Sequence, residues 1–549
     1  MPDHDRLRRL LDRLDGRSWP AYRDLEGAWR LGDATLIVDH VQGDPYAAPS
    51  RVRWVQPSGL PARLHEDPDA CLAAEDWLLR RFGRELHGRK RGSGRSGQLR
   101  VYRPGPEILE RSAVRLRSDG QVEVRFAVGL PGRGRRVLGR QAWALLTENV
   151  PEAAAGLGPH PDLDAQVRSV LAQRTLRRQL ADHGLVAFVA DGAVLPRASG
   201  IDPAPLPGAV PFESPPELQV TLDTPDGPVS GMGVPEGTTL IVGGGFHGKS
   251  TLLLALQHGH LDHVPGDGRE RVVALPDTVK VRAEDGRRVC RVDISAFLGD
   301  LPGGRSTAPF DTEDASGSTS QAAAIVEAVE AGARVLLLDE DTSATNLLVR
   351  DERMRALIPR QSEPITPFVE RVRQLREGWG ISVVMVVGGV GDYLAVADTV
   401  IAMHDFRPEV VTERAHALAP EVPESPGPLP ALAPRVPLAA GLEPDKVRAR
   451  DERRLRYGGG DVELSAVEQI LDAAQAATVG EALRFLHGNV LDGQRTLATA
   501  LDSLDAILDD EGVEVLSRWR HPEGDLVRPR RHEIAAALDR VRTLRIRAS

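Results

Sequence analysis

The chain has 549 residues, 41% of them hydrophobic and 27% charged, a composition typical of soluble globular proteins and sufficient for about three domains. No apolar run is long enough to cross a bilayer, which excludes an integral membrane protein, and the N-terminal residues MPDHDRLRRL lack the apolar core of a signal peptide. With only two cysteines, Cys71 and Cys290, a disulfide framework is excluded, so we expect a cytoplasmic location.

The net charge of −10 is unevenly distributed along the chain. Residues 1–200 contain 32 Arg and Lys against 25 Asp and Glu, so the remainder is strongly acidic. A basic N-terminal third favours contact with a polyanion. A solvated surface that happens to be basic explains the same count equally well.

Two proline-rich stretches, residues 203–216 and 420–444, interrupt helix and strand alike and mark domain boundaries. They predict four parts, in chain order an N-terminal basic α/β domain, a central domain, a Pro-rich linker and a C-terminal helical domain. The expected bounds of these parts are 1–205, 206–420, 421–444 and 445–549.

The first domain is predicted to contain an amphipathic helix at 6–14 and strands at 34–41 and 121–128. Its segment 80–103 is rich in arginine and glycine, which suits contacts with a nucleic-acid backbone, and Tyr102 and Phe82 could stack on bases. The alternative interpretation is a flexible, solvated basic loop. The candidate nucleic-acid contacts are Arg89, Lys90, Arg91 and Arg95.

In the central domain, apolar strands alternate with helices, which predicts a largely parallel sheet covered on both faces. Residues 243–250, GGGFHGKS, fit the P-loop motif G-x-x-x-x-G-K-[ST] between an apolar strand and a helical run. Backbone N–H groups of such a loop cradle phosphates, Lys249 bridges the β- and γ-phosphates and Ser250 ligates Mg²⁺. The candidate ATP-binding residues are Gly243, Gly244, Gly245, Phe246, His247, Gly248, Lys249, Ser250 and Thr251.

An acidic pair, Asp339 and Glu340, ends the apolar strand 335–338. After a P-loop, such a strand supplies the second half of an ATPase site. Asp339 is expected to hold the Mg²⁺ shell together with Ser250, and Glu340 to orient and activate the attacking water. Glu340 and Lys249 are the candidate catalytic residues. Phe212, upstream of the P-loop, is either a core residue or a side chain that stacks on adenine.

A second phosphate site is predicted at the small, hydroxyl-rich loop 315–321, ASGSTSQ, which opens a helix. Its residues Ser316, Gly317 and Ser318 stand a short helix ahead of the acidic strand, a position that resembles the LSGGQ signature of ABC-class ATPases. Residues 341–346 resemble their D-loop. The order of P-loop, signature, acidic strand and D-loop is more specific than any one motif.

The strings GGGFHGKSTLL, ASGSTSQ, LLLDEDTSATN and GGVGDYLAVAD closely resemble the predicted ABC-class ATPases that are not linked to transporters. This resemblance extends almost from end to end. It implies an α/β fold, with a P-loop NTPase core of ABC-ATPase type between a mixed α/β N-terminal domain and a mainly helical C-terminal domain. It also implies a homodimer with nucleic acid as its ligand, RNA being favoured.

In an ABC-type dimer, the P-loop of one core meets the signature of the other across the nucleotide. Ser316, Gly317 and Ser318 would then contact the γ-phosphate of the partner's ATP, and two copies would build two composite sites. One departure concerns the strand after the D-loop. ABC domains usually carry a histidine there that contacts the γ-phosphate, and Gly388 stands at that position. The absence of this histidine argues against fast turnover of ATP.

Two functions remain open at this stage. The first is a homodimeric Mg-ATPase that hydrolyses ATP to drive clamping and release of RNA or another nucleic acid by the flanking domains. The alternative is an ATP-gated protein-binding scaffold with little or no turnover. A P-loop small-molecule kinase is disfavoured because kinases lack a signature loop before the acidic strand.

The C-terminal domain is predicted to be mainly helical. Ser465 and Glu468 form a capping-box pattern that predicts a helix start at the sequence AVEQILDAAQ. The basic run 528–547 either extends the nucleic-acid surface or forms an ordinary surface helix.

Overall fold

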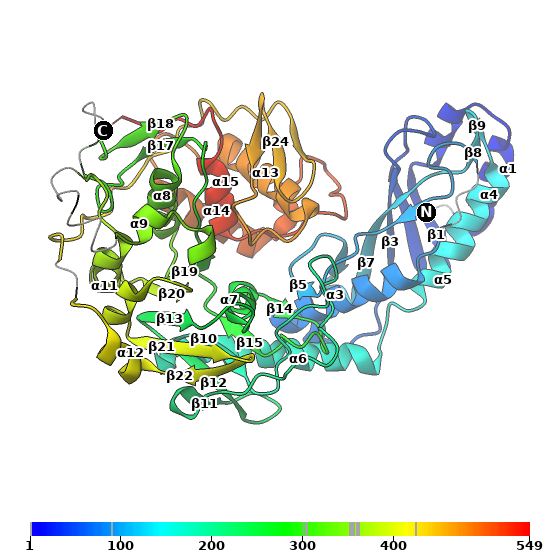
Figure 1. Cartoon of the computed structure of the whole chain (residues 1–549). Helices are drawn as coiled ribbons and strands as arrows, with labels where there is room; N and C mark the ends of the chain where they lie inside the picture. The colour runs from blue at the N-terminus through cyan, green and yellow to red at the C-terminus, as the bar shows by residue number, and fades with distance from the viewer. Residues whose placement is uncertain are drawn as a thin grey trace. The chain divides into compact units, whose positions relative to one another are not determined.

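The computed structural model divides into two compact units, shown in Figure 1. The first comprises Met1–Leu171 and Gly512–Arg528, and the second Ala172–Glu511 and Pro529–Ser549. Among the described residues, no helix is long and apolar enough to cross a bilayer. The structure describes residues 3–88, 92–299, 301, 306–350, 357, 363–422 and 425–548.

The N-terminal unit is built on an antiparallel sheet in the order β1-β2-β3-β7-β4, with β6 also paired to β7. The expected strands 34–41 and 121–128 are confirmed as β2 and β7, and the expected helix as α1, whose leucines are buried. The strands of this sheet are β1 (Gly27–Leu31), β2 (Ala34–His40), β3 (Ser50–Pro57), β4 (Leu99–Arg100), β6 (Val114–Leu116) and β7 (Gln121–Val128), and a separate hairpin consists of β8 (Gly132–Arg133) and β9 (Arg136–Val137). The helices are α1 (His4–Leu14), α2 (Arg63–Glu66), α3 (Pro68–Glu85), α4 (Gly139–Ala144), α5 (Val150–Ala154) and α6 (Pro161–Gln179), which runs into the second unit.

The second unit contains the predicted parallel sheet, in the order β16-β19-β20-β13-β21-β22, in which only β22 is antiparallel. Alternate residues of the strands face opposite sides, because side chains alternate along a strand. Leu336 and Leu338 pack in the cluster that contains α8 and α11, whereas Val335 and Leu337 pack in the cluster that contains α7. The strands are β13 (Thr238–Val242), β16 (Thr278–Lys280), β19 (Val335–Asp339), β20 (Ser382–Val386), β21 (Thr399–His404) and β22 (Arg407–Val410), and the helices α7 (Lys249–His258), α8 (Gly317–Glu330), α11 (Phe368–Trp379) and α12 (Thr412–Leu418).

A smaller antiparallel sheet packs in the same cluster as α7. It contains β11 (Gln219–Leu222), β12 (Val229–Pro235), β10 (Leu185–Ala190) and β15 (Val272–Ala274). Strand β10 lies before residue 205, so the second unit begins upstream of the boundary expected from the proline-rich stretch. Phe212 is 3% exposed in this cluster, which makes it a core residue.

The C-terminal part of this unit combines three helices with a three-stranded sheet. These elements are β23 (Val447–Ala449), β24 (Arg454–Tyr457), β25 (Gly460–Glu463), α13 (Ala473–Asn489), α14 (Leu497–Glu511) and α15 (Arg531–Asp539).

The helix expected to start at Ser465 starts instead at Ala473, so the capping-box prediction is wrong. Asp472 caps it, with a carboxylate oxygen 2.8 Å from the backbone nitrogen of Gln475. The physical reason is tertiary. Glu468 forms ion pairs with strand β16 and its flank, and Gln469 bonds to the strand's backbone, so this stretch forms turns against the parallel sheet.

Candidate nucleotide-binding site

The P-loop connects β13 to α7 at the carboxyl edge of the parallel sheet. Gly243 has φ +135°, and a Cβ there would lie 2.5 Å from the carbonyl oxygen of Met403, so the position requires glycine. The Nζ atom of Lys249 donates to the carbonyl oxygens of Gly243 and Gly244 at 2.7 and 2.8 Å. The loop therefore holds its own lysine at the place where phosphate oxygens bind in P-loop proteins.

The acidic pair reaches the same edge of the sheet. Asp339 pairs in register with Val386, and Val386 pairs with Ile241, so Asp339 is level with the end of the P-loop strand two strands away. Asp339 is 7% exposed, and its carboxylate accepts the backbone N–H of Asp341 at 3.1 Å. Ser250 is exposed at the start of α7. A carboxylate and a hydroxyl oxygen are ligands that suit Mg²⁺, so these two residues fit the metal.

The carboxylate of Glu340 is held by residues that follow β20, the strand between β19 and the P-loop strand β13. Its Oε2 atom accepts the backbone N–H groups of Gly388 at 2.6 Å and Gly389 at 3.0 Å. These glycines follow β20 and occupy the place where ABC domains usually have a histidine. The sequence showed Gly388 at the histidine position but did not predict its contact with Glu340. The signal that could have indicated it is a Gly-Gly pair after a buried strand, because such a pair exposes backbone amide groups.

The signature loop begins helix α8. Ser316 is its N-cap and is exposed, and its hydroxyl accepts the backbone N–H of Thr319 at 3.5 Å. Ser318 is 7% exposed, and its hydroxyl lies 3.3 Å from that of Ser316. The hydroxyl that the loop presents to solvent is therefore that of Ser316, beside the half-buried Gly317.

A buried glutamine joins the signature helix to the loop after Glu340. Gln321 is fully buried, donates to the hydroxyl of Ser343 at 2.9 Å and accepts the N–H of Ala344 at 2.8 Å. Ser343 in turn donates to the carbonyl of Asp339 at 2.8 Å. A shift of one of these two segments must therefore break buried hydrogen bonds or move the other.

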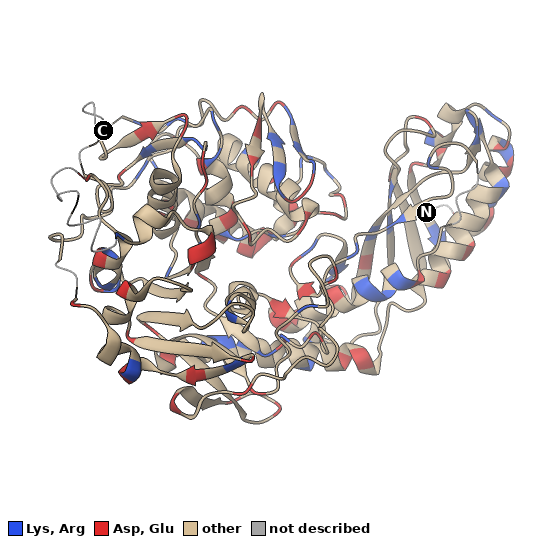
Figure 2. Ribbon diagram, viewed as in Figure 1, with Lys and Arg blue, Asp and Glu red and all other residues tan. Residues whose placement is uncertain are grey.

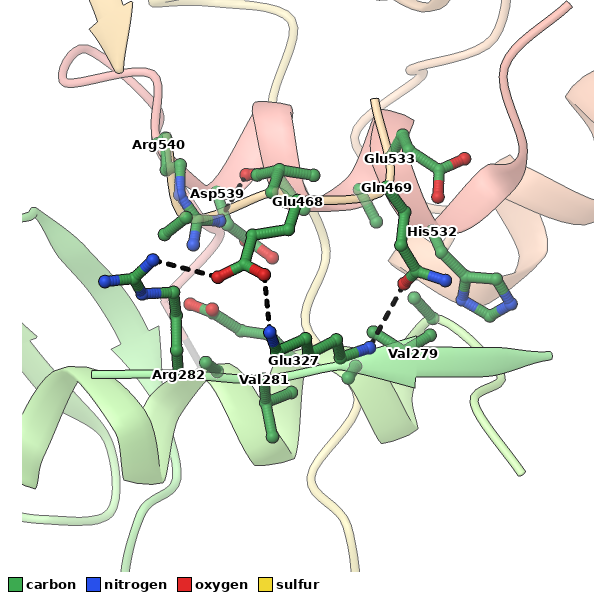
Figure 3. A pocket seen from close by; sticks show the side chains of 18 residues that line it. Val279, Val281, Arg282, Glu327, Glu468, Gln469, His532, Glu533, Asp539 and Arg540 are labelled. Carbon is green, nitrogen blue, oxygen red and sulfur yellow. Dashed lines mark hydrogen bonds and ion pairs between the residues drawn. The ribbon is translucent and has the colours of Figure 1, made fainter. Parts of the chain in front are cut away.

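Helix α8 also supports the C-terminal part of the chain, around a cavity of about 50 Å³ that Figure 3 shows from close by. Glu468 bonds to Lys280 at 2.6 Å and to Arg282 at 2.8 Å. Glu327, which lies on α8, pairs with the buried Arg287 at 2.6 Å.

A second buried pairing ties the proline-rich stretch to α8 and α15. Arg435 lies 2.7 Å from Glu330 of α8 and 2.8 Å from Asp539 of α15. Burial raises the pKa of Asp539 to about 7, Arg435 opposes this shift and Glu327 adds to it.

The candidate nucleic-acid residues lie in the N-terminal unit, where helices carry both basic and acidic segments (Figure 2). Arg89, Lys90 and Arg91 fall outside the described residues, whereas Arg95 is exposed. The loop of Arg95 bonds to the β8–β9 hairpin, since Ser93 N donates to Gly132 O at 2.9 Å and Ser93 Oγ accepts from Gly134 N at 2.8 Å. The hairpin exposes three further arginines, which the sequence reasoning missed, Arg133, Arg135 and Arg136.

Phe82 is fully buried on α3, so the expectation that it could stack on bases is wrong. It faces the core because helix α3 packs against β6, and its ring lies 5.5 Å from that of Phe126 on β7.

Three segments of the chain match known domain families. Residues 159–430 match the P-loop domain of ABC ATPases, residues 4–156 the N-terminal domain described as "ATPase of the ABC class", and residues 446–547 the MRB1590 C-terminal domain.

An uncharacterised protein of Methanocaldococcus jannaschii, MJ1628, is 30% identical over 255 residues. That alignment covers 44% of this chain and 55% of MJ1628, so the chain spans about half the length of that relative.

Two solved ATP-binding cassettes of ABC transporters are also similar. The ADP conformation of MJ1267 is 15% identical, with a TM-score of 0.23 over 36% of this chain and 89% of that one. The cbiO1 protein of Clostridium perfringens, part of the transporter complex cbiONQ, is 15% identical, with a TM-score of 0.23 over 41% and 87%. Taken with the P-loop, the acidic strand and the signature loop, the domain matches show that the chain belongs to the ABC-class ATPases that are not linked to transporters.

Proposed function

We propose that the protein is a Mg-ATPase that binds ATP at the P-loop and hydrolyses it by attack of water on the γ-phosphate. The observation that carries this proposal is the arrangement of Lys249, Asp339 and Glu340 at one edge of the parallel sheet. Backbone N–H groups of the P-loop and of the start of α7 would hold the phosphates, and the Lys249 ammonium group would also bind them. Ser250 and Asp339 would hold Mg²⁺, which neutralises charge on the phosphate oxygens.

Glu340 would orient the attacking water and accept its proton. Its carboxylate already has one oxygen held by the amides of Gly388 and Gly389, which leaves Oε1 for the water. In this proposal, these two backbone amides are the groups that position the base. Hydrogen bonds to a charged carboxylate are stronger than those between neutral groups, so the position is well defined.

The proposal includes a homodimer with two composite sites. Each chain has one P-loop and one signature loop, and Ser316 is exposed at the N-terminus of α8, where partial positive charge favours a phosphate. A second copy would bring its Ser316 and Gly317 to the γ-phosphate, and Ser318 would support the loop from its buried position.

We further propose that closure on ATP drives clamping and release of a nucleic acid, with RNA favoured. Two features support this. Glu330 of the signature helix α8 pairs with Arg435, and Arg435 also pairs with Asp539 of α15, so a movement of α8 would be transmitted to the C-terminal part. The exposed arginines of the 92–97 loop and the β8–β9 hairpin form a basic surface that suits a phosphate backbone.

The nucleic-acid part is tested by fluorescence anisotropy of labelled single- and double-stranded RNA and DNA at several salt concentrations. A triple variant with Arg95→Gln, Arg133→Gln and Arg135→Gln should bind every sequence more weakly. The slope of the logarithm of the binding constant against the logarithm of salt concentration should become shallower by roughly one for each phosphate that the variant no longer neutralises. The matched control replaces three exposed arginines of the second unit, Arg414, Arg450 and Arg453. Equal binding by both triple variants would contradict the assignment.

The second candidate function is an ATP-gated scaffold for another protein, with little turnover. The observation that favours it is that Gly388 stands where ABC domains usually carry the histidine that contacts the γ-phosphate. Binding of ATP with no phosphate release, with or without nucleic acid, would support this function over the first.

A further inference from the structure

The turn between β21 and β22 consists of Asp405 and Phe406, and both residues have positive φ, +47° and +67°. Two-residue hairpin turns of this kind prefer Asn and Gly, because a side chain with positive φ is strained. An aromatic residue in this conformation is strained, and residues with such strain cluster at functional sites. The ring of Phe406 is nevertheless 50% exposed, so burial in the core does not account for its position.

Several contacts fix this turn against the P-loop. The backbone nitrogen of Asp405 donates to Nδ1 of His247 at 2.9 Å. A Cβ on Gly248 would lie 3.1 Å from Cδ1 of Phe406, so the ring lies against the glycine that precedes Lys249. The ring of His404 stacks on that of His247, with centroids 5.3 Å apart and planes 16° from parallel. The rings of His404 and Phe406 thus adjoin the loop that is expected to hold phosphates, beside the ring of the loop's own His247.

We propose that Phe406 is the residue on which the purine base of the nucleotide stacks, with His247 and His404 beside it. This inference rests on the proposed function, since it assumes that phosphates bind at the P-loop. A nucleotide anchored there needs an apolar surface for its base within the length of a ribose and its phosphates. Phe212, the aromatic residue upstream of the P-loop, is buried and cannot serve.

The P-loop has an exposed phenylalanine of its own, Phe246, but this side chain is fully exposed and so has no neighbour to hold its ring. Phe406 is half buried and held against Gly248, which makes it a preorganised surface. Stacking of a base on an aromatic side chain is worth about 1–3 kcal/mol, enough to change affinity at least fivefold.

The test measures the affinity of the full chain for ATP and for inorganic tripolyphosphate, which has the phosphates without ribose or base. The variant Phe406→Ala should bind ATP at least about fivefold more weakly and bind tripolyphosphate as the wild type does. Phe406→Tyr should retain ATP affinity. Leu418→Ala, at an exposed apolar residue of α12, is the control and should change neither affinity.

A second readout uses Phe406→Trp, whose fluorescence should be quenched by ATP and unchanged by tripolyphosphate. Failure of this inference is distinguishable from failure of the proposed function. If wild type binds ATP and Phe406→Ala binds it equally well, base stacking on Phe406 is wrong and the ATP site stands. If wild type binds neither ATP nor tripolyphosphate, the proposed function is wrong and the inference falls with it. An equal loss of both ligands in Phe406→Ala would show that the ring only shapes the P-loop.

Discussion

The Oε2 atom of Glu340 lies 2.6 Å from the backbone nitrogen of Gly388. This contact joins the end of β19 to the end of β20, and with the neighbouring amide of Gly389 it fixes one oxygen of the carboxylate that we propose to act on water. A backbone N–H group donates whatever the side chain is, and it does not change its protonation state near neutral pH. The orientation of Glu340 by this pair is therefore independent of the protonation that a histidine would undergo near neutral pH.

Gly388→Pro removes the shorter of these two hydrogen bonds without adding a charge. We expect kcat for ATP hydrolysis to fall about tenfold to a hundredfold, because a hydrogen bond to a charged group is worth about 1.5–3 kcal/mol. Affinity for ATP should change little, since the amide does not contact the P-loop. Gly391→Pro is the matched control, because Gly391 is the first residue of a short 3-10 helix, a position that tolerates proline. Equal kcat values for both variants would contradict the positioning role.

Gly243→Ala should destabilise the protein before any nucleotide is added. The new Cβ would meet the carbonyl oxygen of Met403 at 2.5 Å and force a strained backbone, which costs about 1–3 kcal/mol. Gly245→Ala is the control, because a Cβ at that position meets nothing within 4 Å. Thermal unfolding of the nucleotide-free variants measures the difference. An unchanged melting temperature for Gly243→Ala would show that the loop adapts freely.

Glu468→Gln should loosen the C-terminal part from the parallel sheet. The change removes the charge that Lys280 and Arg282 share, at a cost of about 1 kcal/mol for partly exposed ion pairs. Hydrogen exchange should become faster in residues 466–469 and along α8. Glu452→Gln, at a half-buried acid of the same region, should leave hydrogen exchange in both segments as slow as in the wild type. No change in exchange for Glu468→Gln would show that apolar packing alone holds this contact.

The pH dependence of stability should reflect Asp539. Its pKa of about 7 in the folded protein lies above the unfolded value of about 3.9, so the folded state binds the extra proton between these values. The stability that this proton contributes is fully present below about pH 4 and is lost as pH rises through 7. Asp539→Asn removes the titration, so its melting temperature should fall less than that of wild type between pH 5.5 and 8.

The control for this comparison is Asp510→Asn, at an exposed carboxylate of α14, which should follow the wild-type pH profile. Parallel profiles for Asp539→Asn and wild type would show that Arg435 keeps Asp539 ionised over this range.

Much of the fold and of the candidate site could be predicted from local sequence patterns. The P-loop between β13 and α7, the acidic end of β19 and the parallel sheet follow from short segments in which glycine, apolar and acidic residues have fixed spacing. The contacts that join these segments were not predictable. Glu340 and Gly388 are 48 residues apart, and the order of the strands brings them together.

Tertiary contacts also overrode local signals. Ser465 and Glu468 have the spacing of a capping box, yet Glu468 pairs with Lys280 and the helix begins at Ala473. The strained turn at Phe406 has no sequence pattern of its own, because an Asp-Phe pair does not predict a two-residue hairpin. Only the parallel pairing of β21 with β13 places that turn beside the P-loop.

The measurement that tests the central claim most directly is phosphate release from ATP by the purified full chain with Mg²⁺, beside Glu340→Gln and Lys249→Ala. We predict release by the wild type, stimulated by a nucleic acid. Glu340→Gln should bind ATP and release phosphate at least about a hundredfold more slowly, and Lys249→Ala should lose ATP binding. Equal rates for wild type and Glu340→Gln, or ATP bound by the wild type with no release under any condition, would contradict the account.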